Sequence, residues 1–328
     1  MTTTSLSEMA ARLRGCRRVF VAGHRSPEGD ALGASLGLVL ALEKLSIEAT
    51  LFNADPCPPG LRFLPRVEDR LTRELSPATR YDVAVLCDCA DPQRVADNLL
   101  ETINAPVWMV LDHHRTESRF EALGHNDPAA PATCELVLQL LGHLGVEVDA
   151  DIAACLYTGL AVDTGNFRFS NSTVRAFEAA AGLVRAGADA PAIAHQLFEE
   201  LPASRLRLLG SALQTLEVSQ DGRIASLTID AEMLRQNGAT VDDMDGLVHY
   251  PRALAGCAAA ILYYISGDGA VRVSLRTSLE PVDVEAVARA FGGGGHQHAA
   301  GCTLQTDFDE AKRLVEAEVE KMLRRRLP

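Results

Sequence analysis

The chain has no surplus of basic residues. Its 31 Lys and Arg residues stand against 44 Asp and Glu residues, which gives a formal net charge of −13. Proteins that grip long nucleic-acid duplexes usually present a broad basic face, because phosphate contacts dominate their affinity. The composition therefore excludes such a face over much of the surface. A local basic pocket for a short anionic ligand stays compatible with this charge.

Long apolar runs and paired cysteines are also missing. No stretch approaches the roughly 20 apolar residues that cross a bilayer, and the apolar run at 19–23 is too short for a secretory signal. The eight cysteines include no CxxC pair, so neither a zinc ribbon nor a disulfide framework is predicted. We therefore expect a cytoplasmic protein without a membrane segment.

The first half of the chain alternates apolar strand patterns with helical patterns. Continuous apolar runs that end in polar residues are typical of strands buried on both faces, and their alternation with helices favours a parallel sheet. We predict an α/β domain over residues 1–188, with a mostly parallel sheet flanked by helices. The expected strands are 17–24, 48–53, 81–89 and 107–114, and the expected helices are 30–45, 134–144, 152–163 and 173–186.

Residues 189–218 are predicted to form a helical linker, interrupted at the Pro-Ala-Ser sequence 202–204. Residues 219–328 are predicted to form a smaller C-terminal α/β domain, in which the period-two pattern of RVSLRTS indicates a mixed sheet. A glycine run follows at 292–295, and we expect the next segment, Ala299 to Gly301, to open a helix. The backbone N–H groups of the run could form an anion-binding nest.

Acids and histidines gather where the predicted apolar runs end. His24 closes the first strand and leads to Glu28 and Asp30, Asp88 closes a later one, and Asp163 ends an apolar run before a Thr-Gly turn. The sequence Asp112-His113-His114 closes another strand. Ligands of open parallel sheets bind beyond the carboxyl ends of the strands, so we expect these groups to converge on one rim.

A rim of carboxylates and imidazoles without thiolate favours Mn²⁺ or Mg²⁺. Several carboxylates this close would repel one another without cations to neutralise them. Two such ions, about 3.5–4 Å apart, activate a water and stabilise both the attacking and the leaving oxygens of a phosphate ester. The pattern therefore points to phosphoester hydrolysis.

Each piece has a structural alternative. Asp30 and Asp88 could cap the helices that follow them, Asp163 could form an Asx-turn, and a His-His pair is often only a surface or core feature. Taken singly, each would be read as structural. Their occurrence together, in order along the chain, favours the metal site.

Six ordered segments of the sequence resemble the motifs of the DHH/DHHA1 phosphoesterases. They are GHRSPEGDALGAS at 23–35, CDCADPQR at 87–94, LDHH at 111–114, YTGLAVDTGNFRFSN at 157–171, SLRTS at 274–278 and FGGGGHQHAAG at 291–301. The resemblance covers nearly the whole chain. Its length and layout are most similar to the stand-alone oligoribonuclease/pAp phosphatase branch of that family, also called the nanoRNase branch.

The resemblance implies a role for each motif residue. His24, Glu28 and Asp88 would hold one metal ion, and Asp30, Asp88, His113 and Asp163 would hold the other, with Asp88 bridging. His114 would act beside the scissile phosphate, and Asp112 would orient the histidines. The substrate-binding residues would be Arg276, Gly293, Gly294, Gly295 and His296. The cofactors would be two divalent ions, Mn²⁺ first and Mg²⁺ as the alternative.

Two departures from the family pattern stand out. Glu28 occupies a position where the family's first motif usually has aspartate, so we expect a working but retuned first metal site. The segment Arg115-Thr116-Glu117 differs from the Pro- and Asn-containing version common after the histidines. That difference leaves the substrate contacts near this loop undefined.

The resemblance implies a Mn²⁺-dependent hydrolase. It would cut short oligoribonucleotides, linear dinucleotides such as pApA and pGpG, and 3′-phosphoadenosine 5′-phosphate (pAp) by attack of an activated water on phosphorus. One alternative is a cyclic dinucleotide phosphodiesterase. Another, from a different class, is a catalytically weak nucleotide-binding module, if Glu28 spoils a metal site. The expected partners are short RNA or nucleotides, with no long duplex DNA and no membrane, and a homodimer is left open.

Overall fold

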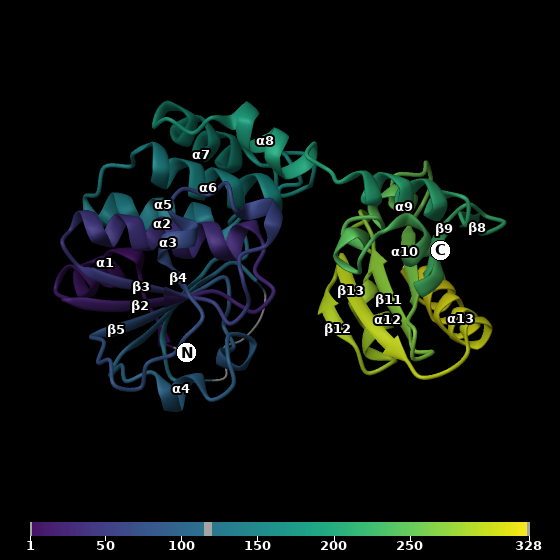
Figure 1. Cartoon of the computed structure of the whole chain (residues 1–328), viewed down its shortest axis with the longest axis horizontal. Helices are drawn as coiled ribbons and strands as arrows, with labels where there is room; N and C mark the ends of the chain where they lie inside the picture. The colour runs from purple at the N-terminus through teal and green to yellow at the C-terminus, as the bar shows by residue number, and fades with distance from the viewer. Residues whose placement is uncertain (1, 115–119, 327–328) are drawn as a thin grey trace. The chain divides into compact units, whose positions relative to one another are not determined.

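The computed structural model describes residues 2–114 and 120–326. It forms two compact units, Met1–Glu200 and Leu201–Pro328 (Figure 1). The boundary falls inside the segment for which a helical linker is predicted. Helix α8 (Ala190–Phe198) belongs to the first unit and α9 (Ala203–Leu213) to the second. Each unit is described by itself.

The first unit consists of a seven-stranded sheet and its helices. Its strands are β1 Thr2–Thr3, β2 Arg18–Ala22, β3 Glu48–Phe52, β4 Leu71–Thr72, β5 Val83–Cys87, β6 Trp108–Asp112 and β7 Leu123–Asn126. Its other helical segments are α1 Leu6–Arg14, α2 Gly29–Lys44, η1 Pro59–Leu61, α3 Val67–Arg70, η2 Pro92–Arg94, α4 Leu99–Thr102, α5 Thr133–Leu144, α6 Ala150–Asp163 and α7 Val174–Arg185.

The strand order of this sheet is β1-β7-β6-β5-β2-β3-β4, and the paired strands run parallel. The chain builds outward from β2 through β3 to β4, and then returns to build outward from β5 on the other side. The neighbours β2 and β5 therefore mark the point where the direction of winding reverses. In open α/β sheets, ligands bind at such a point, beyond the carboxyl ends of the strands.

Both faces of the sheet are covered, as the continuous apolar strand patterns predicted. On β2, Val19 and Val21 pack into the larger core beneath α1, α2, α5 and α6. Phe20 and Ala22 point to the opposite face, where they meet Leu99 of α4. Figure 1 shows the helical layer over one face and α4 on the other side of the sheet. The α/β fold with a mostly parallel sheet flanked by helices is confirmed.

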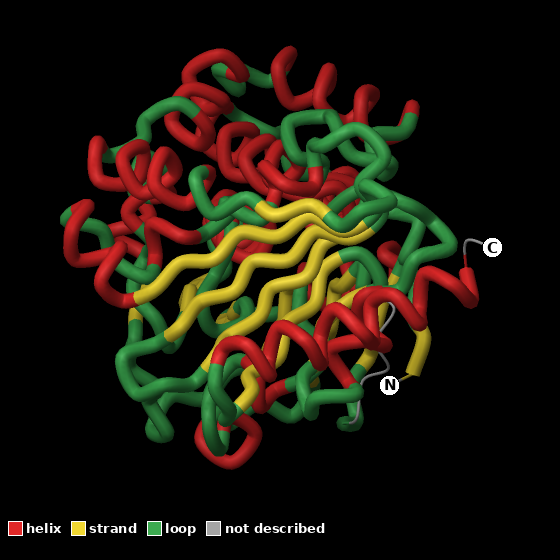
Figure 2. The backbone as a smooth tube through the Cα atoms, turned by 90° about the vertical axis from the view of Figure 1, so that its right-hand side faces the viewer, coloured by secondary structure: helices red, strands yellow, loops and turns green. Residues whose placement is uncertain are grey.

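The second unit has a smaller, mixed sheet. Its elements are β8 Glu217–Val218, β9 Ile224–Asp230, α10 Ala231–Asn237, η3 Asp242–Met244, α11 His249–Arg252, β10 Ala259–Ile265, β11 Val271–Arg276, α12 Val284–Arg289, β12 Gly294–His296, β13 Ala299–Leu304 and α13 Phe308–Arg326, in addition to α9. The strand order is β12-β13-β11-β10-β9-β8, with only the β9–β10 pair parallel. Helix α13 packs against one face of this sheet, as Figure 2 shows from that side.

One local prediction in this unit is wrong. Residues 299–301 were expected to open a helix, but they begin strand β13, which pairs with β11 on one side and β12 on the other. Alanine favours helices, but the preference of Ala299 and Ala300 is small beside the hydrogen bonds that strand pairing forms. Pairing with the distant β11 therefore decides their conformation, and local sequence carries no record of it.

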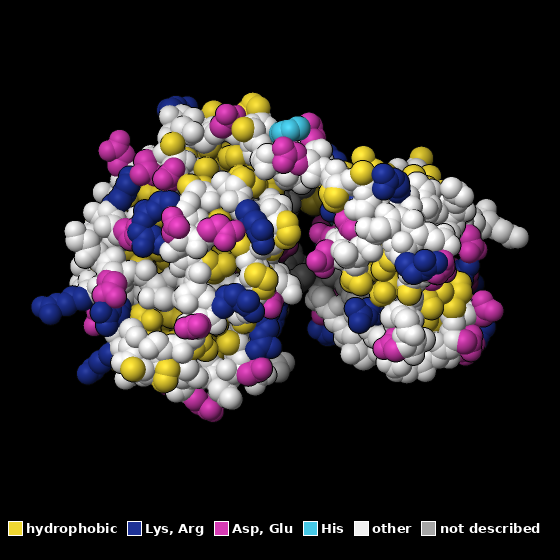
Figure 3. Space-filling view, in the orientation of Figure 1, with side chains coloured by type: hydrophobic (Ala, Val, Ile, Leu, Met, Phe, Trp, Pro, Cys, Tyr) yellow, Lys and Arg dark blue, Asp and Glu magenta, His cyan; other side chains and the backbone are white. Residues whose placement is uncertain are grey.

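Three further observations concern the residues that the structure describes. All eight cysteines are free. None of the helices within 2–114 and 120–326 is long and apolar enough to cross a membrane. On the face turned to the viewer in Figure 3, basic and acidic side chains are intermixed on both units.

Candidate metal centre

The first part of the candidate centre lies at the reversal of winding between β2 and β5. His24 follows β2 by two residues, and Asp88 directly follows β5. Nε2 of His24 lies 3.5 Å from Oδ2 of Asp88 and 3.8 Å from Oε1 of Glu28. One ligand atom from each of these residues lies within 4.8 Å of the others. These three groups could therefore hold one metal ion together, and they are called the first donor set.

A second set of donors adjoins the first. Nε2 of His113 lies 3.0 Å from Oδ2 of Asp163 and 3.9 Å from Oδ2 of Asp30. His113 follows β6, Asp30 lies in the first turn of α2, and Asp163 is the last residue of α6. Asp30, His113 and Asp163 also meet the 4.8 Å criterion for a metal-binding group.

Asp88 lies between the two sets. Its Oδ2 faces His24, whereas its Oδ1 lies 3.7 Å from Nε2 of His113. The side chain is fully buried, and Oδ2 accepts no hydrogen bond from the residues that the structure describes. A buried carboxylate oxygen without a donor is costly unless another partner binds it. The position of Asp88 between the two sets would suit a shared ligand, which is the role that the resemblance implies.

The histidine rings are oriented as metal-binding histidines usually are. Nδ1 of His24 donates to the carbonyl oxygen of Arg25 at 2.7 Å, and Nδ1 of His113 donates to that of Ala130 at 3.2 Å. A carbonyl only accepts, so the Nδ1 atoms carry the protons and the Nε2 atoms face the carboxylates. An outer oxygen that fixes the ring in this way is a regular feature of metal-binding histidines.

The acids crowd one another enough to require positive charge. Burial and the nearby Asp88 carboxylate raise the pKa of Asp30. Burial and Asp30 likewise raise the pKa of Asp163 well above its usual value. Divalent cations would remove this penalty by stabilising the ionised carboxylates. The residues present therefore fit two hard or borderline divalent ions.

His114 and Asp112 form a separate pair beside the two sets. Nδ1 of His114 donates to Oδ1 of Asp112 at 2.7 Å, and the His114 backbone N–H donates to the same oxygen at 3.0 Å. Asp112 is almost fully buried, and Nδ1 of His114 lies 3.4 Å from Oδ1 of Asp88. The pair therefore presents an oriented imidazole at the edge of the carboxylate cluster.

Glu28 reaches the first set in spite of its extra methylene. Its side chain is 50% exposed, in contrast to the buried His24 and Asp88. It is the residue before the first turn of α2, and it makes no capping hydrogen bond with its side chain. The carboxylate is thus available for a cation, but few contacts restrain it.

We expect Glu28→Asp to change the binding of one Mn²⁺ ion and not the other. A shorter side chain loses less rotamer freedom when it binds, so the affinity of the first set should rise about threefold or more. Calorimetric titration of metal-free protein with Mn²⁺ measures both steps. Indistinguishable titrations of the wild type and Glu28→Asp would remove the idea that the extra carbon matters.

The predicted substrate residues lie in the second unit. The backbones of Arg276 and His296 both pair with Ala299, so they occupy one row across β11, β13 and β12. The side chain of His296 lies outside what the structure describes, as do Arg115, Thr116 and Glu117. The strand pairing therefore brings these two predicted residues into register.

The glycine run has a structural role that the sequence did not reveal. A Cβ at Gly293 would lie 2.1 Å from the carbonyl oxygen of Gly301, and one at Gly295 would lie 2.4 Å from that of Ala299. Gly295 also has a φ of +145°. These two glycines are therefore required by the hairpin of β12 and β13. Gly294 faces open space, so it keeps the freedom to approach a ligand.

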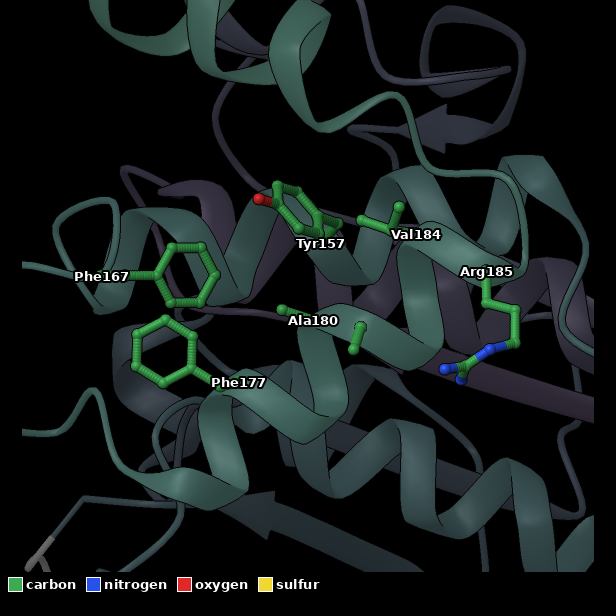
Figure 4. Close-up of a pocket in the computed structure, with 7 residues that line it drawn as sticks. Tyr157, Phe167, Phe177, Ala180, Val184 and Arg185 are labelled. Carbon is green, nitrogen blue, oxygen red and sulfur yellow. The ribbon is translucent and has the colours of Figure 1, made fainter.

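An apolar pocket on the first unit shares no residue with the metal donors. It is lined by Tyr157, Phe167, Phe177, Ala180, Ala181, Val184 and Arg185. Figure 4 shows the rings of Phe167 and Phe177 facing each other, and their centroids are 5.2 Å apart. With no carboxylate or imidazole in its lining, this pocket is not suited to binding a metal ion.

Comparison with known proteins agrees with the geometry. The family described as "DHH family, N-terminal domain" matches residues 18–160, and "DHHA1 domain" matches residues 222–321. The bifunctional oligoribonuclease and PAP phosphatase NrnA of Thermus thermophilus is 37% identical, over 93% of this chain and 90% of its own length. The cyclic-di-AMP phosphodiesterase GdpP of Geobacillus thermodenitrificans is 28% identical over 88% of this chain, but over only 44% of its own length.

A solved structure supports the fold independently. The crystal structure of an exopolyphosphatase-related protein from Bacteroides fragilis superposes with a TM-score of 0.90, and covers 96% of this chain and 95% of its own. Its sequence identity is 24%, so this similarity is evidence for the fold alone. Motifs, fold and relatives agree that this chain belongs to the DHH/DHHA1 family.

Proposed function

We propose that this protein is a divalent-metal-dependent phosphoesterase that hydrolyses short oligoribonucleotides, linear dinucleotides and pAp. The placement of Asp88, with one oxygen toward each donor set, carries the proposal, since a shared carboxylate is what a two-ion centre needs. Supporting it, the relative of 37% identity is named for oligoribonuclease and PAP phosphatase activities.

The proposed roles follow from the contacts of each side chain. His24, Glu28 and Asp88 would hold one ion, and Asp30, Asp88, His113 and Asp163 the other, with Mn²⁺ the first candidate. Bound there, the two ions would supply an activated water and neutralise charge on the phosphate. His114, whose ring Asp112 orients through Nδ1, would stabilise charge on the phosphate or donate a proton to the leaving oxygen.

Arg276 and His296, with the glycine run from Gly293 to Gly295, would bind the substrate. A guanidinium suits a phosphate or the edge of a base, and the row that Arg276 shares with His296 supports a common ligand. Of the three glycines, Gly294 has the space for close contact. The net charge of −13 favours a short substrate, because a long polymer would require a broader basic surface.

We expect Arg276→Ala to raise KM for pAp and pApA about tenfold or more, with a smaller effect on Mn²⁺ binding. Loss of a hydrogen bond to a charged group costs about 1.5–3 kcal/mol. Arg272→Ala is the matched control, because Arg272 lies four residues earlier on β11 and its guanidinium stacks over Tyr264. Equal KM values for the two variants would show that Arg276 does not bind the substrate.

A substrate panel tests the proposed function. Purified protein is incubated with Mn²⁺ or Mg²⁺ and with pAp, pApA, pGpG, a 20-nucleotide RNA and cyclic dinucleotides. We expect phosphate from pAp and mononucleotides from the linear dinucleotides, with little product from the long RNA. Cleavage of cyclic dinucleotides alone would support the alternative of a cyclic dinucleotide phosphodiesterase. The similarity to GdpP is the observation that favours this alternative. Binding without any product would support the nucleotide-binding module.

A further inference from the structure

Thr133, at the start of α5, donates hydrogen bonds to two carboxylates of the proposed metal site. Its fully buried hydroxyl donates to Oδ1 of Asp88 at 3.0 Å. Its backbone N–H donates to Oδ2 of Asp30 at 2.6 Å, and the N–H of Cys134 donates to Oδ1 of the same carboxylate at 2.8 Å. One residue of the chain therefore touches a ligand from each donor set.

We propose that Thr133 is a positioning residue of the metal centre, which fixes the orientation of the Asp88 carboxylate through its hydroxyl. This inference rests on the proposed metal centre. A carboxylate turns easily about its Cβ–Cγ bond, because this torsion has broad, roughly two-fold minima. A donor on Oδ1 restricts that rotation, and it leaves Oδ2 free on the side of His24.

The backbone around Asp88 does not hold the carboxylate by itself. Asp88 has a φ of +59°, and its N–H donates to the carbonyl oxygen of Leu111 at 2.8 Å. These features fix the main chain after β5 but leave the side-chain rotation undetermined. Thr133 supplies a hydrogen bond directly to the carboxylate, so the orientation of both oxygens depends on its position.

The segment that carries Thr133 is itself firmly held. The N–H of Asp127 donates to the carbonyl oxygen of Asp112 at 3.1 Å, and Arg175 forms ion pairs with Asp127 and Glu135 at 2.5 Å each. Asn171 donates to the carbonyl oxygens of Pro131 and Asp163 at 2.9 and 3.1 Å. The chain is thus held before Thr133, at Asp127 and Pro131, and after it, at Glu135, which gives Thr133 a fixed position.

The same segment also reaches His113, through the carbonyl oxygen of Ala130. Asp30, Asp88, Asp163 and His113 are therefore all contacted, directly or through Asn171, by residues 130–134 or their immediate anchors. Because Asp88 would serve both donor sets, loss of the Thr133 hydroxyl should weaken the binding of both ions. That shared effect distinguishes Thr133 from residues that serve only one set.

The test is Mn²⁺ titration of metal-free protein by calorimetry, with three variants beside the wild type. Thr133→Val removes the hydroxyl and keeps the shape, Thr133→Ser keeps the hydroxyl, and Thr158→Val is the matched control. Thr158 is also fully buried, and its hydroxyl donates only to its own helix, at the carbonyl oxygen of Ala154. Loss of an outer hydrogen bond to a metal ligand typically weakens metal binding about 10–100-fold.

We expect Thr133→Val to weaken both binding steps about tenfold or more, and Thr133→Ser and Thr158→Val to stay within about threefold of the wild type. The inference would be overturned if Thr133→Val bound Mn²⁺ with the affinity of the wild type. It would also be overturned if Thr133→Ser bound Mn²⁺ as weakly as Thr133→Val. A wild type that binds no Mn²⁺ would instead contradict the proposed metal centre. If Thr133→Val does not fold, Thr133→Ala against Thr133→Ser carries the same comparison.

Discussion

Asp88→Asn is expected to abolish hydrolysis, with a loss of about a thousandfold or more in kcat/KM. A thousandfold loss corresponds to about 4 kcal/mol of transition-state stabilisation, a reasonable size for removing the ligand shared by two ions. Calorimetry should show that both Mn²⁺ binding steps are lost or strongly weakened. Asparagine tolerates the positive φ of 59° at this position, so the substitution tests the charge and not the backbone.

The free energy of unfolding of the metal-free protein should change much less than the activity. Asp88 repels the Asp30 carboxylate and raises its pKa, but its attraction also raises the pKa of His24 and His113, so a neutral side chain at position 88 removes effects of opposite sign. The chain has a single tryptophan, Trp108 on β6, so its fluorescence reports unfolding of the first unit. Asp97→Asn is the control, because Asp97 is 84% exposed and pairs with Arg25 on the surface. Two-step Mn²⁺ binding by Asp88→Asn would contradict the bridging role.

Gly159→Ala is expected to destabilise the first unit by about 3 kcal/mol, and to weaken Mn²⁺ binding as well. A Cβ at Gly159 of α6 would lie 2.3 Å from Sγ of Cys134 and 2.7 Å from Oδ1 of Asp30. Overpacking of this kind usually costs about 1–3 kcal/mol, and here the obstacles include a Cα of α2, at 2.8 Å. Relief requires α6 to move away from α2, which displaces Asp30 from the centre.

Gly142→Ala is the matched control for that prediction. Gly142 lies within α5 and a Cβ there would meet nothing within 4 Å, so alanine should stabilise the helix by about 0.5–1 kcal/mol. Urea unfolding followed by Trp108 fluorescence measures both changes. If Gly159→Ala unfolds at the same urea concentration as the wild type, the close packing of α6 against α2 and Asp30 is wrong.

The placement of the acids and histidines could be predicted because each follows a strongly patterned element. His24, Asp88 and His113 come after continuous apolar strands, and parallel strands present their carboxyl ends at one edge. The winding order that makes β2 and β5 neighbours is a property of long-range pairing. The sequence does not give this strand order. It supports only the general expectation that ligands of α/β sheets bind at the carboxyl ends of the strands.

The outer contacts could not be predicted from the sequence. Thr133 begins the apolar helix α5 and looks like an ordinary first-turn residue. Its proposed role depends on hydrogen bonds to Asp30 and Asp88, which are distant in sequence. The orientation of the rings of His24 and His113 depends on carbonyl oxygens, which every residue has. The structural role of the glycine run could not be predicted for a related reason, since strand β13 lies too close to Gly293 and Gly295 for a side chain.

The most direct test of the proposed function is hydrolysis of pApA and pAp before and after removal of divalent ions. The account predicts no product from chelated wild-type protein, full recovery on addition of Mn²⁺, and no recovery for Asp163→Ala, which lacks a carboxylate of the second donor set. Hydrolysis that persists in the chelated protein, or that Mn²⁺ restores to Asp163→Ala as fully as to the wild type, would contradict it.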